Sequence, residues 1–430
     1  MLIDPVVLIC FGLFIVLMLF EVPLPFGMLF SSILYAVFNG QSFVMFAQKI
    51  ASSFADFSML AVPAFLFVGI FMNEMGLTEI LFHFCEKWLG NIKGGLAHAN
   101  ILGSMIFAGM SGSALADAGG MGVIEVDAMR KAGYDENFSV ACSAASSTIG
   151  PIIPPSINFV IWAFLSQTST LAMFIGGLVP GVLMGLAMMI WVAYAIPRYR
   201  IKVPAPTKST WKEKWVATLR ALPAIGGPAI LIGGMMTGAF TPTECGVVGA
   251  AYCFFVGLFY KKLNGKMLIR VLKSTLSSSA MVMALCATGL VFNWMIVTSG
   301  LLTTLTQALL ALGNKYLVLA MINVLFLFLG CFIGSMQVLI MMAPLLIAIA
   351  DGFGLSLVHV GVMAVFNLVI GLITPPMAPA LFVTCKATNV SFNKSLKYTL
   401  QFLVPLCLML LAITYIPEVV LWLPRVMGVL

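Results

Sequence analysis

The chain reads Gly150-Pro151-Ile152-Ile153-Pro154-Pro155 in the middle of one apolar stretch and Gly371-Leu372-Ile373-Thr374-Pro375-Pro376 in the middle of another. Each Pro-Pro pair removes two backbone donors and clashes with the preceding helical turn. A membrane helix tolerates such a break only where the freed carbonyl groups face protein, water or an ion. We therefore predict two broken helices, with breaks at Pro154, Pro155, Pro375 and Pro376, and we expect the working site there.

The composition is that of a multi-pass membrane protein. Of the 430 residues, 61% are hydrophobic and 9% are charged, whereas about one quarter of the residues of soluble domains are charged. Apolar runs of spanning length, roughly 20 residues each, recur along the whole chain. We expect an all-α polytopic protein of the bacterial inner membrane, with a retained span and not a signal peptide at residues 1–20.

The two signatures belong to an internal repeat. Gly150 matches Gly371, Ser113 matches Ser335, and Gly76 matches Gly300, all at a nearly constant offset. The sequence of each copy predicts, in order, a span, a re-entrant hairpin, a Pro-Pro-broken helix and a final span. The predicted organisation is N-terminal scaffold spans in 1–50, repeat 1 in 51–197, a basic interfacial connector with two scaffold spans in 198–273, and repeat 2 in 274–430.

The basic residues indicate that the two repeats are inverted relative to each other. If the connector 201–214 is cytoplasmic and the repeats have opposite orientation, all but three of the 22 Lys and Arg residues are cytoplasmic. The exceptions are Lys49, Lys315 and Arg425. Because positive residues are enriched on the cytoplasmic side, the net charge of +7 reflects membrane topology, and we expect no nucleic-acid partner.

Inverted repeats with discontinuous helices are typical of secondary transporters. An enzyme is not expected, because the chain has no GxSxG or HExxH motif and no intramembrane pair of Asp residues. We therefore assign no catalytic residue and no organic cofactor. The nine cysteines lack CxxC spacing and the three histidines lack ligand spacing, so no metal other than Na⁺ is expected. A passive channel or scaffold protein remains the alternative.

Small and hydroxyl-bearing residues cluster before each break. The first copy has the tip 109–113 and the stretch 143–150, and the second copy has 330–335 and 371–376. Exposed carbonyl groups and hydroxyls suit Na⁺, while the amides of the following half-helix suit an anion. Such residues also serve close helix packing. No Lys or Arg lies in these segments, so an anionic substrate would depend on amides, hydroxyls and a bound cation, which predicts strict ion coupling.

Four long motifs resemble the large membrane subunit of TRAP (tripartite ATP-independent periplasmic) transporters, and the likeness covers essentially the whole chain. They are FAGMSGSALADAGGMGVIEVDAMRKAGY with SSTIGPIIPPS inside residues 107–185, GAFTPTECGVVGAAY at 238–252, NLVIGLITPP at 367–376 and TYIPEVVLWLP at 414–424.

The resemblance implies an elevator-type importer, similar to the ion transporter superfamily, that couples Na⁺ to a small organic acid. A C4-dicarboxylate, a sugar acid such as sialic acid and a 2-oxo acid all remain open. The implied partners are a small four-helix membrane subunit, a periplasmic substrate-binding protein and membrane lipid. The implied Na⁺ ligands are Ser111, Gly112, Ser113, Thr148, Gly150, Gly334, Ser335, Gly371 and Thr374. The implied substrate contacts are Ser111, Ser156 and Asn158.

Three positions depart from the family pattern. Many members have an acidic residue where this chain has Gly334, and have Gly and Asn where it has Ala378 and Ala380. These departures leave the polar contacts of repeat 2 and the substrate open.

Asp117 could support a Na⁺ site, cap a helix or pair inside the bundle. A proton-coupled transporter of the same architecture is the second reading, and the number of Na⁺ ions and the oligomeric state stay open.

Overall fold

The computed structural model describes residues 4–430, and every regular element in that range is a helix. Eight helices are long and apolar enough to cross a membrane. They are 57–74, which joins the short 3₁₀ segment η1 (Phe57–Leu60) to α4 (Ala61–Glu74), together with α11 (Thr170–Arg198), α12 (Trp211–Met236), α13 (Pro242–Phe259), α14 (Gly265–Thr298), α16 (Lys315–Phe332), α17 (Ser335–Phe353) and α20 (Phe392–Tyr415). The expectation of an all-α polytopic membrane protein is therefore confirmed.

Repeat 1 begins with a span, continues through a hairpin whose second arm is itself broken, and ends with a long span. Its helices are α4 (Ala61–Glu74), α5 (Leu77–Leu89), α6 (Gly95–Ser111), α7 (Ala114–Gly119), α8 (Met121–Lys131), α9 (Glu136–Ser147), α10 (Ile157–Ser166) and α11 (Thr170–Arg198).

Repeat 2 has the same order, with an unbroken second hairpin arm and one additional terminal helix. Its helices are α14 (Gly265–Thr298), α15 (Leu301–Leu310), α16 (Lys315–Phe332), α17 (Ser335–Phe353), α18 (Leu357–Gly371), α19 (Pro379–Thr388), α20 (Phe392–Tyr415) and α21 (Glu418–Val426). Gly76 and Gly300 have positive φ angles of 67° and 75° and precede α5 and α15. The matched glycines therefore make matched turns.

The remaining helices pack around the first span of each repeat. Helices α1 (Pro5–Leu19), α2 (Leu24–Phe38) and α3 (Val44–Ala55) lie on one side, where α2 and α3 contact α14. Helices α12 (Trp211–Met236) and α13 (Pro242–Phe259) lie along α5 and α4. Both α12 and α13 begin with a capping box, in which Thr210 with Glu213 and Thr241 with Glu244 satisfy the free amides of the first turn.

The helices break where the Pro-Pro signatures predict. Helix α9 ends at Ser147 and α10 begins at Ile157, whereas α18 ends at Gly371 and α19 begins at Pro379. Both Pro-Pro peptide bonds are cis. All residues of the first break are buried, so its non-helical backbone lies against protein. This satisfies the requirement that irregular backbone at membrane depth be covered.

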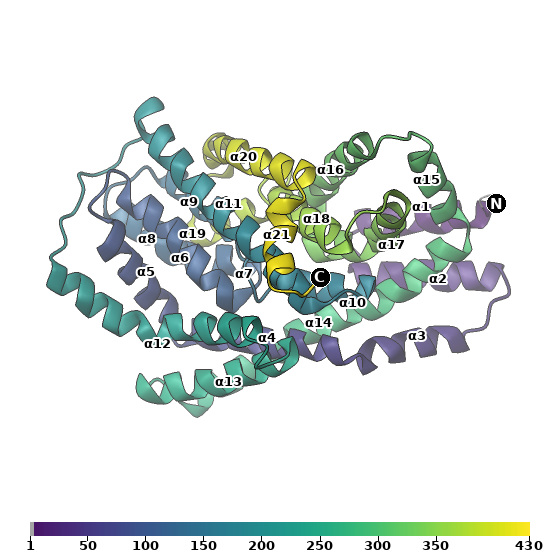
Figure 1. The fold of residues 1–430 in the computed structure, drawn as a ribbon, viewed down its shortest axis with the longest axis horizontal. Helices are drawn as coiled ribbons and strands as arrows, with labels where there is room; N and C mark the ends of the chain where they lie inside the picture. Colours follow the sequence, from purple (N-terminus) through teal and green to yellow (C-terminus); the bar gives the residue numbers. More distant parts are fainter. Residues whose placement is uncertain (1–3) are drawn as a thin grey trace.

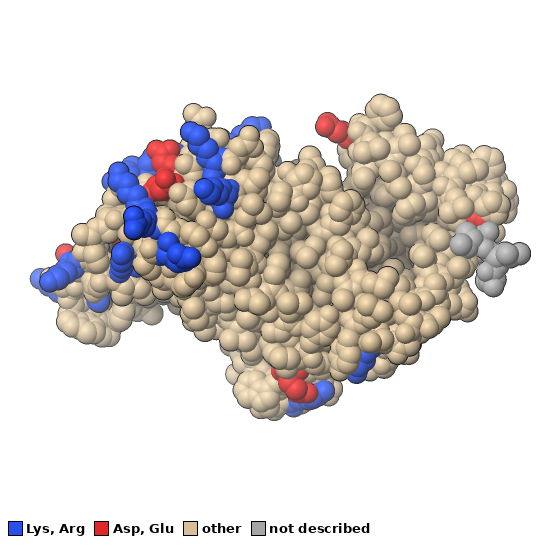
Figure 2. Space-filling view, turned by 90° about the horizontal axis from the view of Figure 1, so that it is seen from above, with Lys and Arg blue, Asp and Glu red and all other residues tan. Residues whose placement is uncertain are grey.

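The two hairpins enter the molecule from opposite ends. In Figure 1 the base of the first hairpin, at α8, lies at the left and its α7 lies toward the middle, whereas α16 and α17 of the second hairpin lie in the right half. On the face shown in Figure 2, Lys and Arg side chains gather at the left end. This distribution matches an inverted pair of repeats with one strongly basic side.

Candidate functional site

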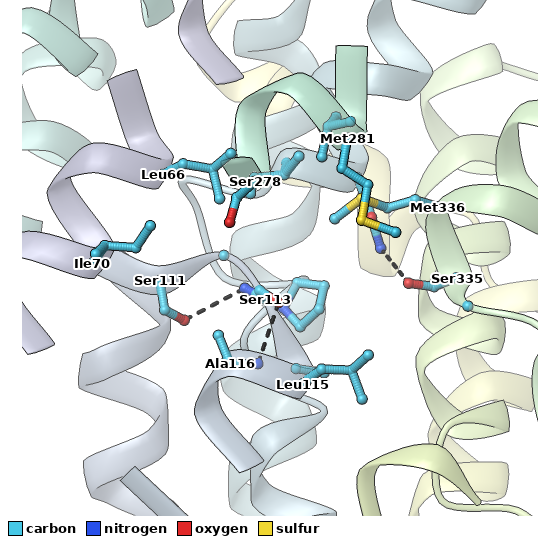
Figure 3. Close-up of a pocket in the computed structure, with 18 of the residues that line it drawn as sticks. Leu66, Ile70, Ser111, Ser113, Leu115, Ala116, Ser278, Met281, Ser335 and Met336 are labelled. Carbon is cyan, nitrogen blue, oxygen red and sulfur yellow. Dashed lines mark hydrogen bonds between the residues drawn. The ribbon is translucent and has the colours of Figure 1, made fainter. Parts of the chain in front are cut away.

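A cavity of about 400 Å³ lies between the two hairpin tips and the first spans of the two repeats. Ser111, Gly112 and Ser113 line it from the first tip, while Gly334 and Ser335 line it from the second. In Figure 3, Leu66 and Ile70 of α4 and Ser278 and Met281 of α14 cover the side that faces the tips. The cavity therefore lies between the hairpin tips and the two first spans, and beside it α4 packs directly against α6 and α14 against α17.

The first tip is a tight turn that lies against its own break. Gly112 ends α6 with a φ of 60°, a conformation that favours glycine. A Cβ atom at Gly112 would lie 2.8 Å from the carbonyl oxygen of Pro155, so only glycine permits this approach. The hydroxyl of Ser113 then accepts from the amide of Ala116 at 3.4 Å (Figure 3) and begins α7.

Asp117 is buried behind this tip. Its side chain is 2% exposed, and neither carboxylate oxygen has a hydrogen-bond partner among residues 4–430. A Cβ atom at Gly150 would lie 2.5 Å from Oδ2 of Asp117. The carboxylate therefore faces the first break directly, between two segments that the sequence assigned to Na⁺. Within the described chain Asp117 neither caps a helix nor forms an ion pair.

Asn158 connects the two repeats at the cavity. Its Nδ2 donates to the hydroxyl of Ser335 at 3.1 Å, although the two residues are 177 positions apart in the chain. The Oδ1 atom of Asn158 is buried and accepts no hydrogen bond from the described residues. Because Asn158 also lines the cavity, this oxygen is an acceptor available beside the cavity.

The second tip lacks an acidic side chain, and a neighbouring amide takes its place. A Cβ atom at Gly334 would lie 2.2 Å from Oε1 of Gln337. The carboxamide of Gln337 therefore fills the space that a side chain at position 334 would need. Below this tip α16 and α18 touch through backbone, since a Cβ atom at Gly371 would lie 2.7 Å from the Cα atom of Gly330.

The other predicted residues lie around the cavity without lining it. The hydroxyls of Thr148 and Thr374 donate to the carbonyls of Ala145 at 2.5 Å and Ile370 at 2.8 Å. Ser156 caps α10 by accepting from the amide of Phe159 and donates to the carbonyl of Pro151. The residues that the cavity brings together are Ser111, Gly112, Ser113, Asn158, Gly334 and Ser335, and those set back from it are Thr148, Gly150, Ser156, Gly371, Thr374, Ala378 and Ala380.

Four polar lining residues were not predicted: Asn73 on α4, Ser274 and Ser278 on α14, and Gln337 at the second tip. Ser274 and Ser278 are four positions apart, which places them on one face of a helix. A four-residue spacing of serines in an apolar span was therefore a usable signal. Asn73 and Gln337 carry no comparable pattern in the sequence.

Comparison with known proteins identifies the family of the chain. The family model described as "Tripartite ATP-independent periplasmic transporter, DctM component" matches residues 11–419. The chain is 37% identical to the sialic acid TRAP transporter large permease protein SiaM of Vibrio cholerae serotype O1, over 94% of this chain and 95% of that protein. It is 34% identical to the C4-dicarboxylate TRAP transporter large permease protein DctM of Pseudomonas aeruginosa, over 91% and 92% of the two chains.

A solved structure shares the fold. The crystal structure of the Alcanivorax borkumensis YdaH transporter superimposes with a TM-score of 0.55 at 16% identity, covering 85% of this chain and 87% of that one. At this identity the likeness concerns the fold alone. The family match over nearly the whole chain shows that this protein belongs to the DctM family, the large membrane component of the tripartite ATP-independent periplasmic transporters.

Proposed function

We propose that this permease imports a small organic acid across the bacterial inner membrane by Na⁺-coupled secondary transport. It would work with a small four-helix membrane subunit and a periplasmic substrate-binding protein. The relatives named above transport sialic acid or C4-dicarboxylates, and both ligands are carboxylic acids. A sugar acid such as sialic acid is the first substrate to test, because the sialic acid relative has the higher identity of the two.

The observation that carries the Na⁺ proposal is the buried carboxylate of Asp117. An ionised carboxylate without a partner is costly in a medium of low dielectric, and a cation removes that cost. Na⁺ is a hard cation that takes oxygen ligands, which the Ser111 hydroxyl, Asp117 and the carbonyl groups of the first tip and break supply. We expect the coupling ion to bind at this point of the mobile hairpin.

The cavity suits a small anion. Its volume of about 400 Å³ lies in the range of roughly 300–1,000 Å³ typical of ligand pockets. Across the described residues its lining contains no Lys or Arg. The N-termini of α10 and α17 reach it at Asn158 and Ser335, and their first amides are free to donate to a carboxylate. A bound Na⁺ would supply the remaining positive charge.

Two contacts support movement of the tips and breaks as one body. Asn158 joins the first break to the second tip, and Arg130 at the base of the first hairpin donates to the carbonyl of Thr388 at 2.9 Å. Both contacts join repeat 1 to repeat 2, the first at the cavity and the second away from it. An elevator motion would carry this body past α4 and α14, which face it across the cavity, and so change the side from which the cavity opens.

Uptake into proteoliposomes containing the full transporter tests the function. The vesicles are supplied with the cognate binding protein and a panel of labelled acids, and either an inward Na⁺ gradient or an equal K⁺ gradient is applied. We expect uptake of a sugar acid or C4-dicarboxylate only with Na⁺. Uptake that persists without Na⁺ and follows a pH gradient would establish the proton-coupled reading instead.

A further inference from the structure

A basic groove lies between α5 and α12, at the end of the molecule where the Lys and Arg side chains gather. Its volume is about 220 Å³, and the two helices lie side by side at the left of Figure 1. Helix α5 contributes Lys87, while α12 contributes Lys212 and Arg220. The groove shares no lining residue with the cavity at the hairpin tips, and the proposed transport step does not use it.

The helical spacing places these cations on the two walls of the groove. Residues four positions apart lie on one face of a helix. His83 and Lys87 have this spacing on α5. Lys212, Val216 and Arg220 have it on α12. All five residues line the groove, so each helix presents one cation-bearing face to the shared space.

The acidic side chains at the groove have partners of their own. The Glu213 carboxylate accepts from the backbone amide of Thr210 at 2.9 Å, in the capping box that begins α12. The Glu86 carboxylate lies 3.2 Å from Nδ1 of His83 on the same helix. Each carboxylate therefore serves a local contact at or within its own helix.

The three cations of the groove have no such partners. Within residues 4–430, Lys87, Lys212 and Arg220 form no ion pair with an acidic side chain. Three cations and one carboxylate, that of Glu213, line the groove. Like charges held close together repel one another. The groove therefore carries a surplus of positive charge that an anion would neutralise.

An apolar stripe runs along α12 beside the groove. Its members are large, exposed and three or four positions apart: Trp211 (68% exposed), Trp215 (58%), Leu219 (62%) and Leu222 (53%). Such spacing places them along one side of the helix, and tryptophan at the end of a span is typical of the boundary between membrane and water. A ligand that meets both the groove and the stripe needs an anionic head and an apolar tail.

The walls of the groove are held together by contacts between the two helices. Nε1 of Trp88 on α5 donates to Oγ1 of Thr218 on α12 at 3.0 Å. The amino group of Lys214 lies 5.5 Å from the ring centroids of both Trp88 and Trp211, so this cation is already engaged. Because these contacts set the separation of the walls, a ligand would not have to order them first.

We propose that the groove binds the phosphate of an anionic phospholipid from the cytoplasmic leaflet. The phosphate oxygens accept from Lys87, Lys212 and Arg220, and a guanidinium group can donate to two of them at once. An acyl chain packs along Leu219 and Leu222. Basic pockets between helices on the cytoplasmic side suit such headgroups. A zwitterionic lipid fits less well, because its ammonium group would meet the surplus positive charge.

A lipid titration of the purified full-length chain in neutral detergent micelles tests the site. Dioleoyl phosphatidylglycerol or dioleoyl phosphatidylcholine is added at constant ionic strength, and the rise in Tm gives the half-saturating lipid concentration. We expect the anionic lipid to raise the Tm more than the zwitterionic lipid. Arg220→Gln and Lys87→Gln should each raise the half-saturating phosphatidylglycerol concentration about fivefold, which is the contribution of one cation at an anionic membrane surface.

Lys266→Gln is the matched control, because Lys266 is an exposed cation at the start of α14, on the same predicted side and outside the groove. It should keep the wild-type value. Where a variant changes the Tm of the lipid-free protein, native mass spectrometry counts the retained phosphatidylglycerol instead.

Three outcomes overturn the inference. One is a wild-type Tm that responds equally to the two lipids, and another is equal weakening in Lys266→Gln and Arg220→Gln, which would indicate unspecific attraction. The third is an equal rise in Tm with inorganic phosphate, which would make the groove a site for a free anion. Loss of the phosphatidylglycerol response when the small membrane subunit is bound would assign the groove to that subunit and overturn the inference as well.

Discussion

Two side chains beside the cavity keep oxygen atoms that accept no hydrogen bond from the described chain, Asp117 and Asn158. Buried polar groups are nearly always paired in folded proteins. Unpaired buried acceptors are therefore expected where a ligand completes the bonding. Asp117 has the charge to hold a cation, and Asn158 has the amide oxygen to accept from a substrate hydroxyl.

Asp117→Asn keeps the size of the side chain and removes its charge. We expect the half-saturating Na⁺ concentration for uptake to rise at least about tenfold, which corresponds to about 1.4 kcal/mol of binding free energy. A Na⁺ titration of initial uptake rates in proteoliposomes measures it. Asp127→Asn provides the control, and an unchanged Na⁺ dependence in Asp117→Asn would remove this residue from the ion site.

Gly334→Ala would place a methyl group against the carboxamide of Gln337. Because that contact is with the end of a flexible side chain, the amide can turn away and the fold should survive. We expect the Tm to be unchanged. The KM for substrate should rise about threefold to tenfold, because the Gln337 carboxamide, which lines the cavity, would lose one hydrogen bond to the substrate, at a cost of about 1 kcal/mol. Gly265→Ala, which meets no atom within 4 Å, should leave both quantities unchanged.

At the scale of helices, the hairpins fit their breaks through backbone contact and not through side chains. In the first repeat the backbone of Gly112 packs against the carbonyl oxygen of Pro155. In the second the backbones of Gly330 and Gly371 pack against each other. Close approach of this kind fixes the spacing between a hairpin and a broken helix without filling the space with side chains.

Gly371→Ala tests the backbone contact between α16 and α18. The new methyl group would lie 2.7 Å from backbone atoms of Gly330, which cannot rotate away. We expect the free energy of unfolding to fall by about 1–3 kcal/mol, as for other overpacked sites. Thermal unfolding measures it against Gly233→Ala, a helical position with no atom within 4 Å, which should be neutral or slightly stabilising. Equal stability of the two variants would contradict the contact.

The helix breaks could be predicted from the sequence because proline acts on its own backbone, whatever surrounds it. The repeat was equally visible, since matched glycines and prolines keep their order. The lining of the cavity depends instead on which helix face lies opposite the tips. Gln337 of α17 reaches the cavity only through tertiary packing, and no local pattern identifies Asn73, whereas the four-residue spacing of Ser274 and Ser278 was a usable signal. Ser156 shows the opposite case. Its place beside the break predicted a substrate contact, but in the structure its side chain caps α10.

At the scale of the whole molecule, the basic residues mark one end and the cavity lies between the two hairpins. Lys208 lies in the connector, on the predicted cytoplasmic side, and Lys315 lies at the start of α16, on the other side. Both positions are exposed. Their side assignments follow from the basic residues of the connector together with the inverted arrangement of the repeats.

Single cysteines at these two positions test the topology. Eight of the nine native cysteines are buried, so background labelling by a membrane-impermeant maleimide should be low. In intact cells whose outer membrane has been permeabilised, we expect Lys315→Cys to react and Lys208→Cys to react only after the inner membrane is opened. Labelling of both from outside would contradict the inverted topology.

The connector between α11 and α12 has one further consequence. Residues 201–210 contain no helix, yet they join two halves that are already held together by contacts such as Asn158 with Ser335 and Arg130 with Thr388. Assembly of the halves therefore does not depend on the peptide bond between them. A permease encoded as two separate genes, divided within 203–206, should reassemble in the membrane and support growth on the substrate.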